Sequence, residues 1–492
     1  MYRKPDDQHT VYTFLSPLGR GLNPKNRWVK LADQIPWDYV EQEYAKNFKP
    51  DGAPAIPART AFGSLVIQTR MGTSDAETRQ LITENLYLQY FIGLTEFQME
   101  PPFDTSMMHH FRKRIPADMI RRINEETLHP GTHTRKDNDQ DDPPAAGGTT
   151  DDTQTTELPA NKGNLIMDAT CTPANIKYPT DLSLLNEARV KLDKIIDHQH
   201  QPLRGIVDRP RTYRNIGKKQ YLDVAKAKQP GKKKRRRGIR QQLEHVNRNL
   251  KAVDALLLQP GSAPLTDKQI AMLETIRILY QQQDTMFKEG THRIENRIVS
   301  LHQPHVRPIV RGKVKQPTEF GAKVSISLVN GYAYTERISW DNFNESTDLI
   351  LAVQRYLQRH GCYPEAVIAD KIYRNRKNIA YCKEKGIRIS GPALGRKNKA
   401  LAKVQRAQER LDEAIRNAVE GTFGVGKRCY GLDRIMTKLK ETSETMIEMG
   451  FYTMNLEKKL RVLLTLFTKQ LCFWLKRPLY RLGLLKECYM AA

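Results

Sequence analysis

One stretch of the chain cannot belong to a folded core, and it divides the sequence. Residues 137–157 contain seven acids, no Lys or Arg and, apart from prolines, no apolar residue larger than alanine. Such a stretch buries too little surface to offset the entropy lost when it is ordered. We therefore expect an acidic disordered linker over residues 131–161. It separates an N-terminal domain, residues 1–130, from a larger part that begins near Lys162.

The net charge points to a polyanionic partner. The 492 residues include 80 Lys and Arg against 55 Asp and Glu, which gives +25 at pH 7, and such a surplus attracts nucleic acid from a distance. Residues 203–240 alone hold fifteen basic and two acidic residues, with an extreme at Lys232, Lys233, Lys234, Arg235, Arg236 and Arg237. A solvated loop is the plainer interpretation, but concentrated like charges repel one another. We expect this segment to bind phosphates.

Membrane, secreted and zinc-binding proteins are disfavoured. The start of the chain lacks the apolar segment of a signal peptide, and the apolar stretch from Leu460 to Leu475 is interrupted by Arg461 and Lys469. The six cysteines are scattered without a Cys-x2-Cys pair, so neither a zinc module nor a disulfide framework is indicated. We expect a soluble cytoplasmic protein with reduced cysteines and no membrane partner.

The N-terminal part reads as a helical bundle. Pro57 can open one helix, and the segment from Ser74 to Glu77 has the pattern of a capping box for the next. A further helix, from Thr105 to Arg114, ends in three bases, Arg112, Lys113 and Arg114. A basic helix in a small bundle suits a helix-turn-helix reader of duplex DNA, and a purely structural bundle is the alternative.

The part from residue 162 to 440 reads as a mixed α/β domain. Short apolar runs predict strands at 164–168, 366–370 and 387–390, and residues 320–329 and 332–340 alternate around Asn330-Gly331, the signal for a tight hairpin. Amphipathic patterns at about 190–300 predict an inserted helical hairpin that follows the basic segment. Residues 441–492 read as a basic helical C-terminal segment.

Three acids could hold metal ions in this domain. Asp168 and Asp370 each end a predicted strand, and Glu420 lies on a predicted helix with Arg416 and Lys427 on the same face. Singly, each acid is better explained as a cap or a surface ion pair. Together, carboxylates are the hard oxygen ligands that Mg²⁺ or Mn²⁺ prefers. Two such ions can activate the attacking oxygen and stabilise the leaving oxygen of a phosphodiester displacement.

With these motifs in place, the sequence resembles the DDE transposases of bacterial insertion sequences, in the broad IS-four/IS-five superfamily. The likeness rests on the helical N-terminal domain, on Met167-Asp168-Ala-Thr170 followed by Tyr178-Pro-Thr-Asp181, on Ala369-Asp370-Lys-Ile-Tyr373, and on the helix from Arg416 through Glu420 to Lys427 and Arg428. It implies an RNase H-like catalytic domain with Asp168, Asp370 and Glu420 as the catalytic and metal-binding triad. It also implies that Arg416 and Lys427, with Arg428 beside them, contact the backbone of the transposon end.

The resemblance sets the functional expectation. The protein should bind the terminal inverted repeats of its element through its N-terminal domain. With two divalent cations, Mg²⁺ or Mn²⁺, it should then cleave DNA and join it to target DNA, as a homodimer in the DNA complex. Where relatives carry a Tyr three residues before the Arg, this chain has Glu413, so that residue's role is not transferred. Two alternatives are a catalytically silent DNA-binding derivative and an RNase H-like nuclease without strand transfer.

Overall fold

The computed structural model describes residue 2 and residues 10–16, 21–49, 54–131, 159–310, 318–391 and 402–481; within these, the side chains of residues 402, 403 and 467–481 are left out. The linker expected at 131–161 lies almost entirely outside the described residues. The boundaries that the sequence suggests between domains remain predictions.

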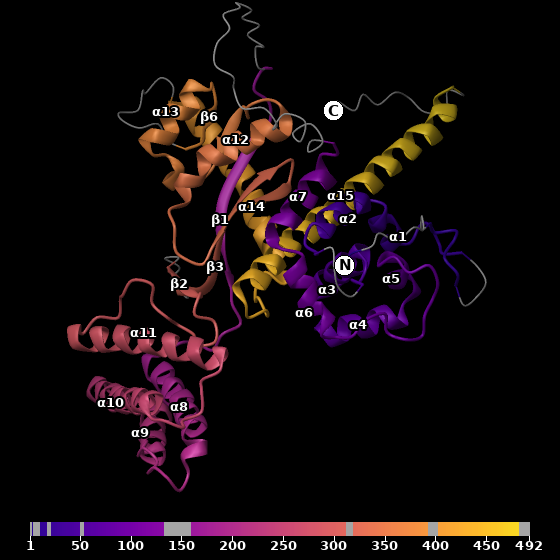
Figure 1. Cartoon of the computed structure of the whole chain (residues 1–492). Helices are drawn as coiled ribbons and strands as arrows, with labels where there is room; N and C mark the ends of the chain where they lie inside the picture. Colours follow the sequence, from indigo (N-terminus) through magenta and orange to yellow (C-terminus); the bar gives the residue numbers. More distant parts are fainter. Residues whose placement is uncertain are drawn as a thin grey trace, which may run out of the picture.

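Helices fill the described N-terminal part (Figure 1). They are α1 (Arg27–Ala32), α2 (Trp37–Ala45), α3 (Ala58–Met71), α4 (Asp75–Glu84), α5 (Leu86–Phe91), α6 (Met107–Arg114) and α7 (Ala117–Leu128). Pro57 directly precedes α3, and the Ser74 hydroxyl caps α4 by accepting a hydrogen bond from the Glu77 N–H at 3.2 Å. Both helix starts lie where the sequence predicts them.

The second part is built on a mixed sheet. Its strands are β1 (Asn164–Pro173), β2 (Arg307–Val310), β3 (Thr318–Val329), β4 (Tyr332–Ser339), β5 (Ala366–Ile368) and β6 (Arg388–Ile389), in the order β2-β3-β1-β5-β6, with β4 also paired to β3. β1 is antiparallel to β3 and parallel to β5. The turn between β3 and β4 is the predicted Asn330-Gly331 hairpin, and both residues have positive φ, 51° and 77°.

Helices cover both faces of this sheet. On one face, Ile166, Ile326 and Ile368 pack with Val419 of α14 (Ala402–Cys429). On the other, Leu165, Met167 and Val367 pack under α12 (Leu349–His360), α13 (Arg376–Glu384) and the short 3-10 turns η2 (Glu345–Asp348) and η3 (Lys371–Tyr373). A mixed sheet flanked in this way fits an α/β RNase H-like domain.

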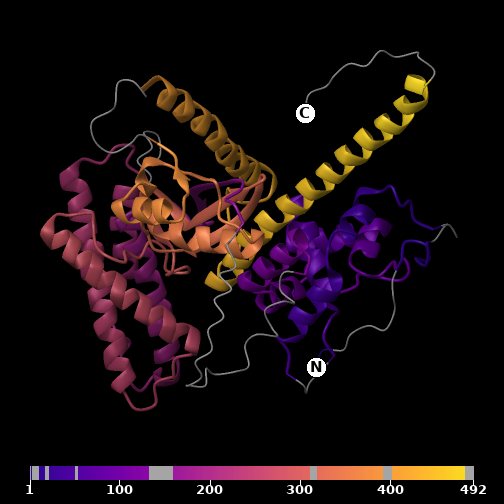
Figure 2. The same ribbon diagram turned by 90° about the horizontal axis from the view of Figure 1, so that it is seen from above.

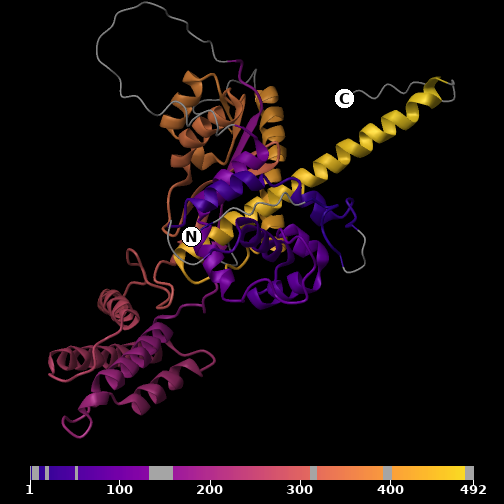
Figure 3. The ribbon, with the colours of Figure 1, turned by 45° about the vertical axis from the view of Figure 1, so that its right-hand side comes forward.

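A helical arm interrupts the sheet between β1 and β2 (Figure 3). It comprises α8 (Asp181–His200), the 3-10 turn η1 (Gln201–Leu203), α9 (Arg214–Ala225), α10 (Lys232–Leu258) and α11 (Asp267–Glu289), with an apolar core of its own. Thr266 and Gln269 form a capping box at the start of α11. From the sequence, we expect the basic segment to lie ahead of the helical insertion, but α10 begins at Lys232, so the run Lys232–Arg237 lies in its first turns.

The long helix α15 (Lys440–Arg481) joins the two parts (Figure 2). Met449, Tyr452, Leu456 and Leu460 belong to the core of the N-terminal helices, while Ile447, Phe451 and Met454 of the same helix belong to the core on the α14 face of the sheet. The amide of Asn455 bonds both backbone groups of Ala333 in β4, at 2.9 and 2.7 Å. The first half of α15 is therefore a shared structural element of both parts.

From the sequence, we also expect reduced cysteines and no membrane partner. Cys171, Cys362 and Cys382 are buried free thiols, and Cys429 is an exposed free thiol. Among the residues that the structure describes, no helix is both long enough and apolar enough to cross a membrane.

Candidate active site

The register of the sheet brings Asp168 and Asp370 together. Ile166 of β1 pairs with Ile368 of β5 in parallel, and each aspartate lies two residues further along its strand direction. Because neighbouring strands are about 4.8 Å apart and side chains alternate between faces, the Asp168 carboxylate belongs to the face that carries Ile166, Ile368 and Val419. Asp370, just after the end of β5, is close enough for its charge to act on Asp168. Two strands thus deliver two acids side by side beneath α14.

The expectation that Asp168 ends its strand is wrong. β1 continues to Pro173 because its antiparallel pairing with β3 continues, from Asp168 opposite Ile326 to Pro173 opposite Gly321. What ends near Asp168 is the pairing with β5, which stops at Ile368. Asp370 does follow its strand, and its carboxylate accepts a hydrogen bond from the Lys371 N–H at 2.6 Å at the start of η3.

Helix α14 carries the third predicted acid. Gly421, Gly424 and Gly426 do not break this helix, so Arg416, Glu420 and Lys427 lie on one continuous element. At Gly426 a Cβ would lie 2.9 Å from the tip of the Leu432 side chain, so any larger residue there would displace that side chain. Val419 is fully buried against the sheet, and its neighbour Glu420 is exposed. The helix therefore passes over the two aspartates with Glu420 open to solvent.

The pKa of Asp168 depends on its burial and on the charged groups around it. Burial raises the pKa of Asp168 to about 6, with contributions from the carboxylates of Glu345 and Asp370, while the hydrogen bond from the Ala169 N–H (2.8 Å) and the Arg416 guanidinium act against the rise. Arg416 therefore lies near the paired aspartates, as its predicted place on the face of Glu420 requires. Like charges held together in a half-buried site favour a bound cation.

Glu345 is an acid that the sequence did not single out. It opens η2, its carboxylate pairs with Lys323 of β3 at 2.8 Å, and its charge acts on both Asp168 and Tyr373. Nothing in the local pattern around Glu345 distinguishes it from an ordinary turn residue, because its proximity to Asp168 arises from the packing of η2 on the sheet.

The donor set fits a hard divalent cation in part. Asp168 and Asp370 supply carboxylate oxygens from adjacent strands, the type of ligand that Mg²⁺ and Mn²⁺ take alongside water and phosphate. Within the described residues, however, no three acidic, histidine or cysteine side chains lie close enough together to hold a metal ion. The structure therefore brings two of the predicted acids together, with Glu420 on the covering helix but outside that group.

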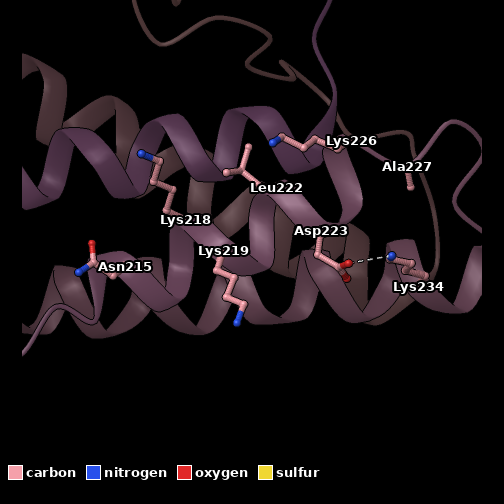
Figure 4. Close-up of a pocket in the computed structure, with 8 residues that line it drawn as sticks. All are labelled: Asn215, Lys218, Lys219, Leu222, Asp223, Lys226, Ala227 and Lys234. Atoms are coloured by element: carbon pink, nitrogen blue, oxygen red, sulfur yellow. Dashed lines mark hydrogen bonds and ion pairs between the residues drawn. The ribbon is translucent and has the colours of Figure 1, made fainter.

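The basic run of α10 lies on the surface of the arm. All six residues from Lys232 to Arg237 are exposed. Lys234 pairs with Asp223 at 2.9 Å, and Arg236 lies over the Phe287 ring. Lys218 and Lys219 of α9, Lys226 just after its end and Lys234 line one surface hollow of about 640 Å³. Figure 4 shows these side chains and the ion pair of Lys234 with Asp223. Six cations in the first two turns of a helix oppose its dipole, so this surface is suited to an anionic partner.

The basic helix of the N-terminal part differs from the expectation at one residue. Arg112 is buried and paired with Asp75 of α4, and it also donates to the Gln68 side chain at 3.0 Å. The Arg112 charge is neutralised inside the bundle, because the side of α6 that carries Phe111 and Arg112 packs on α3. Lys113 is exposed, and the Arg114 guanidinium lies 4.8 Å from the centre of the Phe48 ring. The expectation that Arg112 contacts DNA is therefore wrong, while Lys113 and Arg114 stay candidates.

The last predicted contacts lie at the end of α14. Lys427 is half-buried, and Arg428 is exposed with its Nε donating to the Gly424 carbonyl at 3.2 Å. They follow Glu420 by about two helical turns, on the element that crosses the paired aspartates.

Two family models match this chain. Residues 17–114, from before α1 to the end of α6, match a transposase domain (DUF772), and residues 367–457, from β5 into α15, match the transposase DDE domain. The second match includes Asp370 and Glu420. An uncharacterized protein, ORF8 in the nfe locus of Rhizobium meliloti, is 28% identical over 175 residues, which are 36% of this chain and 75% of that protein. No solved structure matches significantly. The matches to two transposase domains in one chain, whose parts share helix α15, support a DDE transposase of an insertion sequence.

Proposed function

We propose that this transposase binds the terminal inverted repeats of its own element and catalyses metal-dependent cleavage and strand transfer of DNA. The observation that carries the proposal is the register of β1 and β5, which sets Asp168 beside Asp370 under the helix of Arg416 and Glu420. Bound at these acids, two Mg²⁺ or Mn²⁺ ions would supply an activated attacking oxygen and a stabilised leaving oxygen.

Different residues of the chain would bind the metal ions, the phosphates near the cleaved bond and the rest of the DNA. Asp168, Asp370 and Glu420 would hold the cations, with Glu420 reaching the set from the exposed face of α14. Arg416, Lys427 and Arg428 would hold the phosphates that flank the cleaved bond, because guanidinium and ammonium groups donate to phosphate oxygens. Lys113 and Arg114 would contact the inverted repeat, and Lys232–Arg237 would hold backbone without reading bases.

The assembly and place of action follow from this chemistry. Joining two element ends to one target requires two active sites on DNA, so we expect a homodimer in the DNA complex, with inverted repeats and target duplex as partners. We expect the protein in the bacterial cytoplasm, associated with the nucleoid when it is bound to DNA.

One observation favours a second candidate, a catalytically silent DNA-binding derivative. Glu420 is exposed and, among the described residues, is not gathered with the two aspartates. In the silent protein this separation would persist on DNA.

Cleavage and joining of end-containing DNA by the wild-type chain distinguish these functions. The substrate is a duplex that carries the terminal repeat of the element, incubated with a supercoiled target plasmid. The proposal expects cleavage and joined products in Mg²⁺, DNA binding without cleavage in Ca²⁺, and no cleavage in EDTA. Binding without cleavage in Mg²⁺ would indicate the silent derivative, and cleavage without joined products would indicate a plain nuclease.

A further inference from the structure

A cavity lies where the helical arm leaves and rejoins the sheet. It has a volume of about 500 Å³ and is lined by residues from the end of β1 (175–179), the first turns of α8, Tyr221 of α9, the return segment 299–303 and Lys438. The outgoing and returning connections of the arm both contribute to this lining. The cavity is separate from the paired aspartates and is not used by the proposed chemistry.

One wall of the cavity is aromatic. Tyr178 is 72% exposed, and it meets Phe320 edge-on with ring centres 5.6 Å apart and planes at 87°. A single contact of this kind leaves at least one face of the Tyr178 ring available. Tyr221 also lines the cavity and is half-buried. Exposed aromatic faces are the surfaces on which unpaired bases stack, at a gain that does not depend on base identity.

A buried amide in the lining lacks a partner. Gln303 is 3% exposed, and its Nε2 donates to the Asn175 carbonyl at 3.4 Å. Its Oε1 is buried with no hydrogen-bond partner among the described residues. Buried polar atoms are normally satisfied by protein or water, so this acceptor is open to a donor that enters the cavity. The exocyclic amino group or ring N–H of a nucleobase is such a donor.

The charges at the rim suit the rest of a nucleotide. Lys177 and Lys438 both line the cavity, and both are exposed. They come from segments far apart in the sequence. The one acid in the lining, Glu187, is paired with His302 at 3.3 Å. Two lysines beside an aromatic wall can hold the phosphates on either side of a stacked base.

The cavity lies at a definite distance from the candidate active site. β1 runs from Asp168 to Pro173, five residues or about 17 Å, before the chain enters the lining at Asn175. At 3.4 Å per nucleotide step, about 17 Å corresponds to about five nucleotides, and the about 24 Å that seven extended residues span from Asp168 to Asn175 corresponds to about seven.

We propose that this cavity binds one unpaired nucleotide of the DNA, with its base stacked on Tyr178 and its flanking phosphates held by Lys177 and Lys438. The inference rests on the proposed function, since it places the nucleotide about five to seven steps from the cleaved phosphate. Because both connections of the arm line the cavity, an occupied cavity would also fix the arm and its basic surface relative to the sheet.

Photo-crosslinking on the full-length protein tests this site. Duplexes carry the terminal repeat and one unpaired 5-iododeoxyuridine, placed in turn at each position from two to ten nucleotides from the cleaved phosphate, in Ca²⁺. We expect one position, about five to seven nucleotides away, to give crosslinks to the peptide that contains Tyr178. Y178F should keep the crosslink yield, and Y178A should lower it at least about fivefold. Y12A, which removes a tyrosine that is 79% exposed elsewhere, should not lower it.

The same duplexes, incubated in Mg²⁺, separate the two proposals. Cleavage without a position-dependent crosslink to this peptide, or with a yield that Y178A leaves unchanged, overturns the nucleotide site and leaves the proposed function standing. A position-specific crosslink that Y178A removes supports the site even if the DNA is not cut, and in that case it is the cleavage proposal that fails.

Discussion

Of the three predicted metal ligands, Glu420 is the one that is not already grouped with the others. It must come to the paired aspartates from an exposed position on α14, whereas Glu345 already acts on Asp168. Glu345, however, is committed to its ion pair with Lys323. A carboxylate that is already neutralised by a lysine is a poorer metal ligand than one that is open to solvent.

These two acids give the first prediction. E420Q should lower the rate of DNA cleavage by at least about a thousandfold, the scale of a lost transition-state charge interaction, with little change in DNA affinity. E345Q and E413Q, the latter a control two turns earlier on α14, should each stay within about tenfold of wild type. If E345Q loses cleavage while E420Q keeps it, Glu345 is the third acid.

Arg112 and Lys113 are adjacent in sequence but should behave differently. R112A removes the charged partner of Asp75 and the donor to the Gln68 side-chain carbonyl oxygen, and should lower the free energy of unfolding by about 2–3 kcal/mol. K113A should leave that free energy within about 0.5 kcal/mol and weaken DNA binding instead. Urea unfolding and fluorescence anisotropy measure the two effects. Equal loss of stability in both variants would contradict this division.

At the residue scale, the sequence predicted the two aspartates but not their setting. Asp168 and Asp370 come at the ends of apolar runs, and the sequence of a single strand is enough to show such a run. That Asp168 lies within β1 depends on pairing with β3, about 150 residues away, and the burial of Arg112 depends on α4. The proximity of Glu345 has the same origin. Long-range contacts of this kind leave no local pattern.

At the element scale, the basic residues at the start of α10 destabilise that helix. Its six exposed cations repel one another and oppose the helix dipole. Replacing Lys232, Lys233, Arg235 and Arg237 by Gln should weaken binding to all duplexes alike. It should also reduce the slope of log affinity against log salt by up to about 0.9 for each phosphate that is no longer neutralised. The control K251Q/K268Q changes two exposed lysines outside the run. An altered sequence preference with an unchanged slope would contradict the assignment.

The contact between α7 and the sheet contains a pair of histidines. The rings of His129, at the end of α7, and His360, at the end of α12, meet at 5.0 Å, and His129 bonds the Tyr334 hydroxyl at 2.8 Å. Burial, with the nearby His129 and Arg359, lowers the pKa of His360 to about 4. The pKa of His129 is also lowered, by burial first and then by Arg359 and Lys459, with Glu125 opposing.

A pH dependence of stability follows from this pair. Between the ordinary histidine pKa of about 6.5 and the lowered value, the unfolded chain binds more protons than the folded chain. The free energy of unfolding should therefore fall as the pH falls from about 6.5 toward about 4. H360Q should make urea unfolding less pH-dependent over this window, whereas H110Q, at an exposed position, should not. An identical pH slope in H360Q and wild type would exclude His360 as a contributor.

At the scale of the whole molecule, α15 makes the N-terminal bundle dependent on the C-terminal part. Met449, Tyr452, Leu456 and Leu460 complete its core, and Glu448 pairs with Arg121 of α7 at 2.6 Å. From the sequence, we expect residues 1–130 and residues 441–492 to be separate units. Hydrophobic periodicity shows that a helix has an apolar face, but it does not show which partner covers that face.

A fragment experiment tests this dependence. Residues 1–131 alone should lack the cooperative unfolding transition of a packed bundle, because burial of four large apolar side chains is lost. A peptide of residues 440–466 added in trans should restore that transition, and the same peptide with Y452A and L456A should not. A fragment that unfolds cooperatively alone, at the same temperature with or without the peptide, would show an independent domain.

The central claim is that Asp168 and Asp370 form the metal-dependent cleavage site of a transposase. Its most direct test is the cleavage rate of a terminal-repeat duplex in Mg²⁺ by D168N and D370N, beside anisotropy measurements of the affinity for the same duplex in Ca²⁺. Each amide keeps the shape of the side chain and removes the charge. We predict that both variants bind the duplex within about threefold of wild type and cut it at least about a thousandfold more slowly. Cleavage by either variant at near the wild-type rate would contradict this claim.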